Sequence, residues 1–354
     1  MAAPGVTGAA DMTGPMPRLY GIQYLRAVAA LAVVVYHATD RTGSRFTVGA
    51  AGVDIFFVIS GFVMWTLAET RPTTPLRFYR DRTLRVAPLY WLVTMVMVAG
   101  ALAGLFPRVR LTLDHVLASL LFIPHRSPSN GELWPLLVQG WTLNLEMFFY
   151  LIFGLVLLLP RSRRFTALAG ALLILVAAGL VLVPSDPVLF TYTRPIMLEF
   201  LCGAALGRLW LTRRLPGRFF GGAAVLAASA GFAWLAVYPG MIHEFLFGLF
   251  AVLLVTGVLT LEKGGAVRRF PLLNYLGDSS YSIYLWHALA VSVVFKLAAM
   301  LAFSQFATAA AATLAGTLLG VLSYEILEKP LMALTKGRRP ASSAARPASA
   351  EAAS

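Results

Sequence analysis

Apolar stretches long enough to cross a lipid bilayer recur along nearly the whole chain. A helix needs about 20 apolar residues to span the hydrocarbon core, and ten stretches approach this length, at about 22–39, 52–70, 86–106, 138–160, 164–183, 194–212, 218–236, 242–261, 280–302 and 306–328. Of the 354 residues, 58% are hydrophobic and 13% are charged, roughly half the charged fraction of a soluble domain. Because lipid offers no hydrogen-bond partners, such stretches fold as helices. The sequence therefore predicts an all-α, polytopic transmembrane helix bundle.

One further apolar segment, 111–123, is too short to cross a membrane comfortably. We expect it to enter the membrane and return on the same side, so that the bundle has about ten spans plus one short re-entrant segment. Residues 20–332 are then one membrane domain. The flanking tails, 1–19 and 333–354, are rich in Ala, Pro, Ser or Gly, and their composition predicts disorder.

The basic residues predict how the bundle is oriented. Short cytoplasmic loops of membrane proteins are enriched in Lys and Arg, and the most basic loop lies between residues 71 and 85. With ten crossings, the cytoplasmic side of the membrane holds this loop and both termini. It also holds the arginines at 161–164, 213–214 and 268–269. These loops account for much of the net charge of +13, so the charge does not indicate nucleic acid as a partner.

The first predicted span contains two polar interruptions, Arg26 and His37. Eleven residues make almost exactly three helical turns, so both side chains leave one face, roughly 16 Å apart along the axis. Charged and titratable side chains are costly in a membrane and normally face the bundle interior or a water-filled cavity. The predicted orientation places Arg26 near the cytoplasmic face and His37 near the outer face.

Two carboxylates are expected at a depth similar to that of His37. Asp54 begins the second span and Glu146 lies in the outer half of the span at 138–160. A carboxylate that orients an imidazole favours its action as a general base. The sequence therefore predicts His37, Asp54 and Glu146 as catalytic candidates, and it leaves open which carboxylate pairs with the histidine. His37 alone is equally compatible with a structural hydrogen bond between helices.

Arg82 and Arg85 are three residues apart, on one helical face, where the third span enters the membrane. Paired guanidinium groups suit phosphate, which they bind through two parallel hydrogen bonds. Together with Arg26 they are the candidates for a phosphate-binding site at the inner face. Arg71 and Arg77, in the same loop, are fully explained by the charge bias of cytoplasmic loops.

Other polar residues have simpler interpretations. Ser60-Gly61 indicates close packing of two helices. His287 is expected in the inner third of its span, and Glu328 is expected to pair with an arginine at the inner face. Pro330 is expected to end the last span. No group of His, Cys, Asp and Glu has the spacing of a metal site, so no metal is expected.

Six segments together resemble acyltransferase family 3, a family of integral-membrane acyltransferases. They occur in the family's order: Tyr24–Ala27 with Tyr36 and His37; Gly52–Phe62; Phe78–Trp91; Trp141–Glu146 with Phe148–Tyr150; Leu276–His287; and Glu328–Pro330. They cover residues 20–332. Two positions depart from the family pattern: Thr142 replaces the usual serine, and Asp81 stands where a further arginine is common.

The resemblance implies an O-acyltransferase of the bacterial cytoplasmic membrane. Acyl-CoA, in most members acetyl-CoA, would bind from the cytoplasm with its phosphates on Arg26, Arg82 and Arg85. His37 would deprotonate a hydroxyl of an extracytoplasmic carbohydrate or related acceptor, for direct attack on the thioester or through a relay. A soluble domain that some members carry is not expected here, which leaves room for a separate envelope partner protein.

Two other function classes fit parts of the sequence. A proton-coupled transporter or flippase of a glycan or acyl compound would use His37 and Asp54 as a proton relay, although the two halves show no convincing repeat. A structural subunit of an envelope complex would tolerate loss of His37. The acceptor pocket is expected in the outer loops, at about 40–51, 124–137 and 184–193, whose sequences do not define the acceptor.

Overall fold

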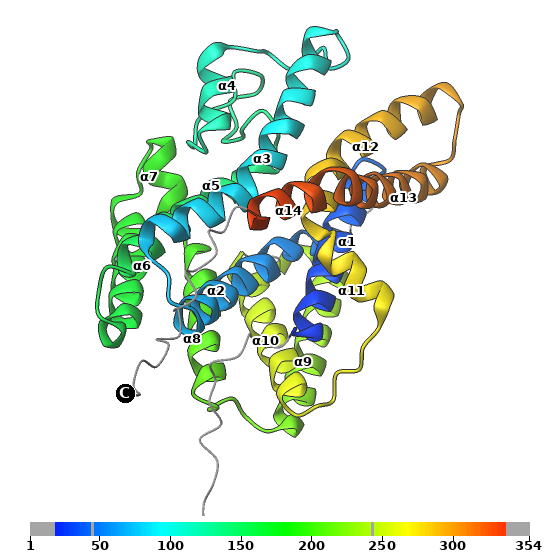
Figure 1. Ribbon diagram of the computed structural model, residues 1–354. Helices are drawn as coiled ribbons and strands as arrows, with labels where there is room; N and C mark the ends of the chain where they lie inside the picture. The colour runs from blue at the N-terminus through cyan, green and yellow to red at the C-terminus, as the bar shows by residue number, and fades with distance from the viewer. Residues whose placement is uncertain (1–17, 44–45, 242–243, 338–354) are drawn as a thin grey trace, which may run out of the picture.

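The structure, a computed structural model, describes residues 18–43, 46–241 and 244–337, and these residues form helices and connecting loops. The long helices pack as one bundle (Figure 1). Their bounds are α1 Tyr20–Asp40, α2 Gly52–Thr70, α3 Pro75–Leu102, α5 Gly140–Val156, α6 Arg161–Leu182, α8 Met197–Leu211, α9 Arg218–Val237, α10 Glu244–Lys263, α12 Ser280–Met300 and α13 Gln305–Ser323. The all-α helix bundle predicted from the sequence is confirmed.

Short helices connect the long ones. They are η1 Thr47–Ala51, α4 Leu113–Leu120, α7 Pro187–Tyr192, η2 Pro239–Met241, α11 Pro271–Asp278, the π-helical turn η3 Tyr324–Glu328 and α14 Lys329–Gly337. The helix continues past Pro330, so the expectation that this proline ends the last helix was wrong. Pro330 is the second residue of α14 and directly follows the π-helical turn η3, where the regular α-helical hydrogen-bond pattern is already interrupted. The predicted tails fall mostly outside the described residues.

Eight helices of the described chain are long and apolar enough to cross a membrane. The two remaining predicted spans, at 138–160 and 194–212, contain the shorter helices α5 and α8, with 17 and 15 residues. The count of ten crossings therefore stays a prediction. The chain is an integral membrane protein by the length and composition of its helices.

The segment at 111–123 forms the short helix α4, beside the far end of α3 (Figure 1). The Tyr90 hydroxyl donates to the Ser119 carbonyl at 3.0 Å, and the Trp91 indole donates to the Leu120 carbonyl at 2.8 Å. These bonds satisfy carbonyls at the end of α4 that have no partner within the helix. Eight residues of α-helix extend only about 12 Å, so α4 does not span a bilayer.

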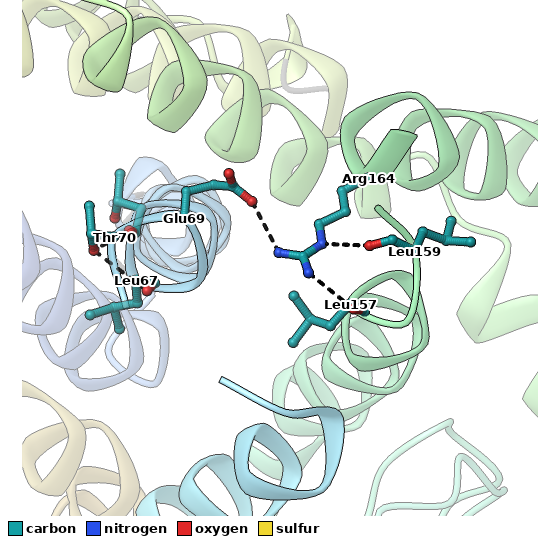
Figure 2. A network of polar contacts seen from close by, with 7 residues as sticks. Leu67, Glu69, Thr70, Leu157, Leu159 and Arg164 are labelled. Atoms are coloured by element: carbon teal, nitrogen blue, oxygen red, sulfur yellow. Dashed lines mark hydrogen bonds and ion pairs between the residues drawn. The ribbon is translucent and has the colours of Figure 1, made fainter. Parts of the chain in front are cut away.

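An ion pair places the start of α6 at the same end of the bundle as the end of α2. Arg164 contacts Glu69 at 3.4 Å, and its guanidinium also donates to the carbonyls of Leu157 and Leu159 (Figure 2). The arginines at 161–164 therefore lie at the same end as the basic loop after α2. This agrees with α4 returning to the side from which it came.

Close helix contacts fix how α2 packs on α8. A Cβ on Gly61 would lie 2.0 Å from the Phe200 carbonyl oxygen, and one on Gly203 would lie 2.0 Å from that of Val58. The two backbones therefore touch at positions where only glycine fits. The expectation that Ser60-Gly61 permits close packing is confirmed. The Phe200 ring stacks on Phe149 of α5, with centroids 4.5 Å apart, so α2, α5 and α8 form one buried core.

Candidate functional site

A central pocket brings the three predicted phosphate-binding arginines together. Arg26 comes from α1, whereas Arg82 and Arg85 come from α3, and all three line a pocket of about 200 Å³ between α1, α2, α3, α5 and α12. Within the described chain, Arg26 and Arg82 form no ion pair. Arg26 and Arg82 therefore present positive charge to the pocket, which an anionic ligand can neutralise.

Arg85 is held by Glu328 at the wall of this pocket. Its guanidinium forms an ion pair with the carboxylate, which also accepts a hydrogen bond of 2.6 Å from Ser282. The Glu328 side chain is 3% exposed and that of Arg85 is 27% exposed. The expected pairing of Glu328 with an arginine is confirmed. Arg85 thus both compensates a buried carboxylate and presents positive charge to the pocket.

Glu146 lies in the same pocket as the arginines. One of its oxygens accepts hydrogen bonds from the Ser60 hydroxyl at 2.9 Å and the Tyr150 hydroxyl at 2.5 Å. These bonds join α2 to α5 and fix the carboxylate. Glu146 lies nearly two turns along α5 and lines the pocket that Arg26 also lines, and its predicted pairing with His37 stays a prediction.

Two hydroxyl groups lie together on the wall of the pocket. Thr142 of α5 and Tyr284 of α12 lie 2.9 Å apart, oxygen to oxygen, and both line the pocket. The Tyr284 ring lies 5.8 Å from the His287 ring, measured between centroids, and the His287 ring lies 5.0 Å from that of His37. A chain of side chains therefore leads from the wall of the pocket to His37.

The orientation of His37 is set by its own helix. Its Nδ1 lies 2.9 Å from the Val33 carbonyl, and a carbonyl only accepts, so Nδ1 carries the proton in the neutral ring. Nε2 is left as the basic nitrogen. The Val33 carbonyl thus orients the His37 ring, a role that the sequence predicted for Asp54 or Glu146. Asp54 is buried in the first turn of α2, at 4% exposure.

His287 is fully buried and lies beside His37. The sequence had placed His37 near the outer face and His287 in the inner third of its span, and these two predicted depths cannot both hold. The Nδ1 of His287 donates to the Tyr284 carbonyl at 2.6 Å, and its Nε2 lies 3.5 Å from Nε2 of Gln139. Gln139 was not predicted as a functional residue. Polar groups are costly in a membrane helix. This cost was the signal in the sequence that could have identified His287 and Gln139.

A larger cavity, of about 980 Å³, lies at the end of the bundle where α5 begins and α6 ends. Segments 126–134 and 183–195 supply much of its wall, as the sequence analysis expected for loops 124–137 and 184–193. Its polar and aromatic side chains include Trp134, Trp141, Arg126, Glu132 and Arg194. The Arg194 guanidinium lies over the Trp141 ring at 5.7 Å. Aromatic faces beside charged groups suit a ligand with both apolar and polar surfaces, such as a sugar.

The fold and the central pocket define a class of protein: a polytopic helical membrane protein with an arginine-lined internal pocket next to a histidine pair. The family described as the acyltransferase domain matches residues 19–325. The chain belongs to acyltransferase family 3, and it is a membrane acyltransferase. Family membership thus favours the enzyme over the transporter and structural-subunit alternatives.

Relatives with curated names agree with this class. The chain is 52% identical over 306 residues to the exopolysaccharide production protein ExoZ of Rhizobium meliloti, covering 86% of this chain and 96% of that protein. It is 27% identical to the acyltransferase MdmB of Streptomyces mycarofaciens, covering 95% and 97% of the two chains. It is 26% identical to the peptidoglycan O-acetyltransferase OatA of Listeria monocytogenes, covering 75% of this chain and 48% of that protein. No solved structure matches the chain.

Proposed function

We propose that the protein transfers an acyl group, acetyl in the simplest case, from cytoplasmic acyl-CoA to a hydroxyl of an extracytoplasmic carbohydrate or related envelope acceptor. The observation that carries this proposal is the central pocket, whose wall carries Arg26, Arg82 and Arg85 together with Tyr284, the residue next to the histidine pair. Acyl-CoA carries phosphates at one end of a long arm and the thioester at the other. Arginines match the phosphates, and a histidine matches the need for a base at the thioester.

In this proposal His37 acts through Nε2. That nitrogen removes the proton from the acceptor hydroxyl while the oxygen attacks the thioester carbonyl, so that a C–O bond forms and the C–S bond breaks. The proton then passes to the departing thiolate of CoA. The hydroxyls of Thr142 and Tyr284 line the thioester end of the pocket, where donors to the developing oxyanion stabilise the transition state. His287 lies between Tyr284 and His37.

Glu146 and Asp54 have different places in this scheme. Glu146, fixed by Ser60 and Tyr150, offsets part of the positive charge near Arg26. We propose that it tunes donor binding rather than orienting His37. Asp54 begins α2 beside the pocket residues Val53 and Phe56, and its catalytic role stays a prediction.

The acceptor side of the proposal is supported by the Trp134 and Trp141 cavity. Carbohydrates stack their apolar ring faces on aromatic side chains and hydrogen-bond with charged groups at their edges. The names of the relatives refer to an exopolysaccharide and to peptidoglycan, and both are carbohydrate polymers. We propose that a polysaccharide or a precursor of one is the acceptor, in the bacterial cytoplasmic membrane, with both termini cytoplasmic.

The test uses sealed membrane vesicles containing the protein, labelled acetyl-CoA and a panel of polysaccharide acceptors. With the cytoplasmic face outward, added acetyl-CoA should label an acceptor enclosed in the vesicles. His37→Gln should lower transfer by about 100-fold or more, the usual contribution of a general base, and Arg163→Gln, at an exposed residue outside the pocket, should leave it unchanged. Transfer by His37→Gln at the wild-type rate would refute the assignment of the base. Label accepted only from the opposite face would refute the orientation.

A further inference from the structure

A second cavity lies at the cytoplasmic end of the proposed donor path. It has a volume of about 130 Å³ and is lined by the end of α2, the following loop and the start of α3. Met64 and Arg82 line both this cavity and the central pocket, so the two spaces meet at these residues. The second cavity is thus positioned as an extension of the arginine-lined pocket.

Two arginines that the sequence analysis attributed to topology line this second cavity. Arg71 follows the last residue of α2, and Arg77 lies in the first turn of α3, with Asp81 one turn later. Together with Arg82 they give three cations and one carboxylate on the wall. The cavity therefore carries a net positive charge, which attracts an anionic ligand.

The nearest carboxylate on α2 is engaged elsewhere. Glu69 precedes Arg71 by two residues, but it pairs with Arg164, which the carbonyls at the end of α5 hold in place (Figure 2). The Glu69 and Arg164 side chains are only 19% and 15% exposed. Because this ion pair is largely enclosed, Glu69 does not compete with an incoming anion for Arg71 or Arg77.

The size of the central pocket requires such an extension. At about 200 Å³ it is smaller than the usual range of roughly 300–1,000 Å³ for ligand pockets, and acyl-CoA is a large ligand. The pantetheine arm and pyrophosphate of acyl-CoA would occupy the central pocket, where Arg26, Arg82 and Arg85 lie. The nucleotide, with its separate 3′-phosphate, then extends past Arg82 into the second cavity.

We infer that Arg71 and Arg77 form a distinct subsite for the 3′-phosphate of the donor's nucleotide. This inference rests on the proposed function, because it assumes that coenzyme A carries the acyl group. It adds a property that the function alone does not require: the protein distinguishes coenzyme A from thioesters that lack the 3′-phosphate. A pantetheine thioester on a carrier protein would leave the subsite empty.

The test compares binding of coenzyme A and 3′-dephospho-coenzyme A to the protein in lipid nanodiscs, by isothermal titration calorimetry. The wild-type protein should bind coenzyme A at least about tenfold more tightly, as expected for one phosphate held by charge-assisted hydrogen bonds. In Arg71→Gln/Arg77→Gln this preference should disappear, with little change in the affinity for dephospho-coenzyme A. Arg71→Lys/Arg77→Lys should retain part of the preference, because the charge remains.

Arg161→Gln/Arg163→Gln is the matched control, since it removes two exposed arginines from the same end of the bundle. Thermal unfolding of each variant verifies that it is folded. If the Arg71/Arg77 variant keeps the preference, or if the control loses it equally, the subsite is refuted while the proposed function stands. Equal binding of both compounds by the wild type also refutes the subsite. Binding of neither compound by the wild type refutes the coenzyme A donor itself.

Discussion

The ion pair between Arg85 and Glu328 makes a prediction about stability that can be separated from donor binding. The Glu328 side chain is 3% exposed and depends on Arg85 and Ser282 as partners, whereas the Arg85 side chain is 27% exposed and borders the pocket. Removing one partner of a buried ion pair costs about 3–5 kcal/mol, because it leaves an uncompensated charge. The two single substitutions should therefore be destabilising to different extents.

We expect Arg85→Met to be near the upper end of this range, about 5 kcal/mol, since it leaves a carboxylate that is almost without solvent contact. Glu328→Gln should be near the lower end, about 3 kcal/mol, because water in the pocket solvates the remaining guanidinium. The double variant has no unpaired charge. Its cost should be below that of Arg85→Met alone, and so smaller than the sum of the two by about 3 kcal/mol or more.

The assay is unfolding in mixed micelles of mild detergent and dodecyl sulfate, followed by tryptophan fluorescence, for the wild type and the three variants. Additive effects, or an Arg85→Met variant no less stable than Glu328→Gln, would show that Arg85 does not compensate Glu328. Coenzyme A titrations then measure the second role of Arg85, which is donor binding, separately from its effect on stability. The double variant should regain stability but not donor affinity, because the pocket has still lost one of its three cations.

Three further outcomes are expected. Trp134→Ala should raise the KM for a polysaccharide acceptor by about tenfold without changing the KM for acetyl-CoA, and an unchanged acceptor KM would place that site elsewhere. Gly61→Ala should destabilise the protein by about 3 kcal/mol, as a Cβ there would lie 2.0 Å from a carbonyl oxygen of α8; the control Gly170→Ala, which has open space around it, should have little effect. Burial, and next a neighbouring histidine, lower the pKa of His115 from its ordinary 6.5, so the folded protein binds fewer protons than the unfolded chain. Stability should therefore fall as the pH drops through about 6.5, by at most about 1.4 kcal/mol per pH unit, and thermal unfolding at about pH 7.5 and 5.5 should show a loss that His115→Phe reduces.

Much of the fold was predictable from the sequence because lipid restricts what a chain can do. An apolar stretch in a bilayer must satisfy its own backbone hydrogen bonds, so length and hydropathy are enough to predict helices. Helical periodicity also predicts which residues of one helix share a face, and Arg82 and Arg85 do line one pocket. The glycine at 61 was interpreted correctly for the same reason, since a small residue in an apolar helix signals a close neighbour.

Only the tertiary structure decided how residues of different helices meet. Periodicity fixes positions within a helix but not the relative rotation and depth of two helices, which depend on how their side chains pack. That is why Glu146 lies with the arginines, why His287 lies beside His37, and why the loop arginine Arg71 lines a cavity. The sequence supplied the polar residues and the cost of placing them in a membrane, and the packing of the bundle determined their partners.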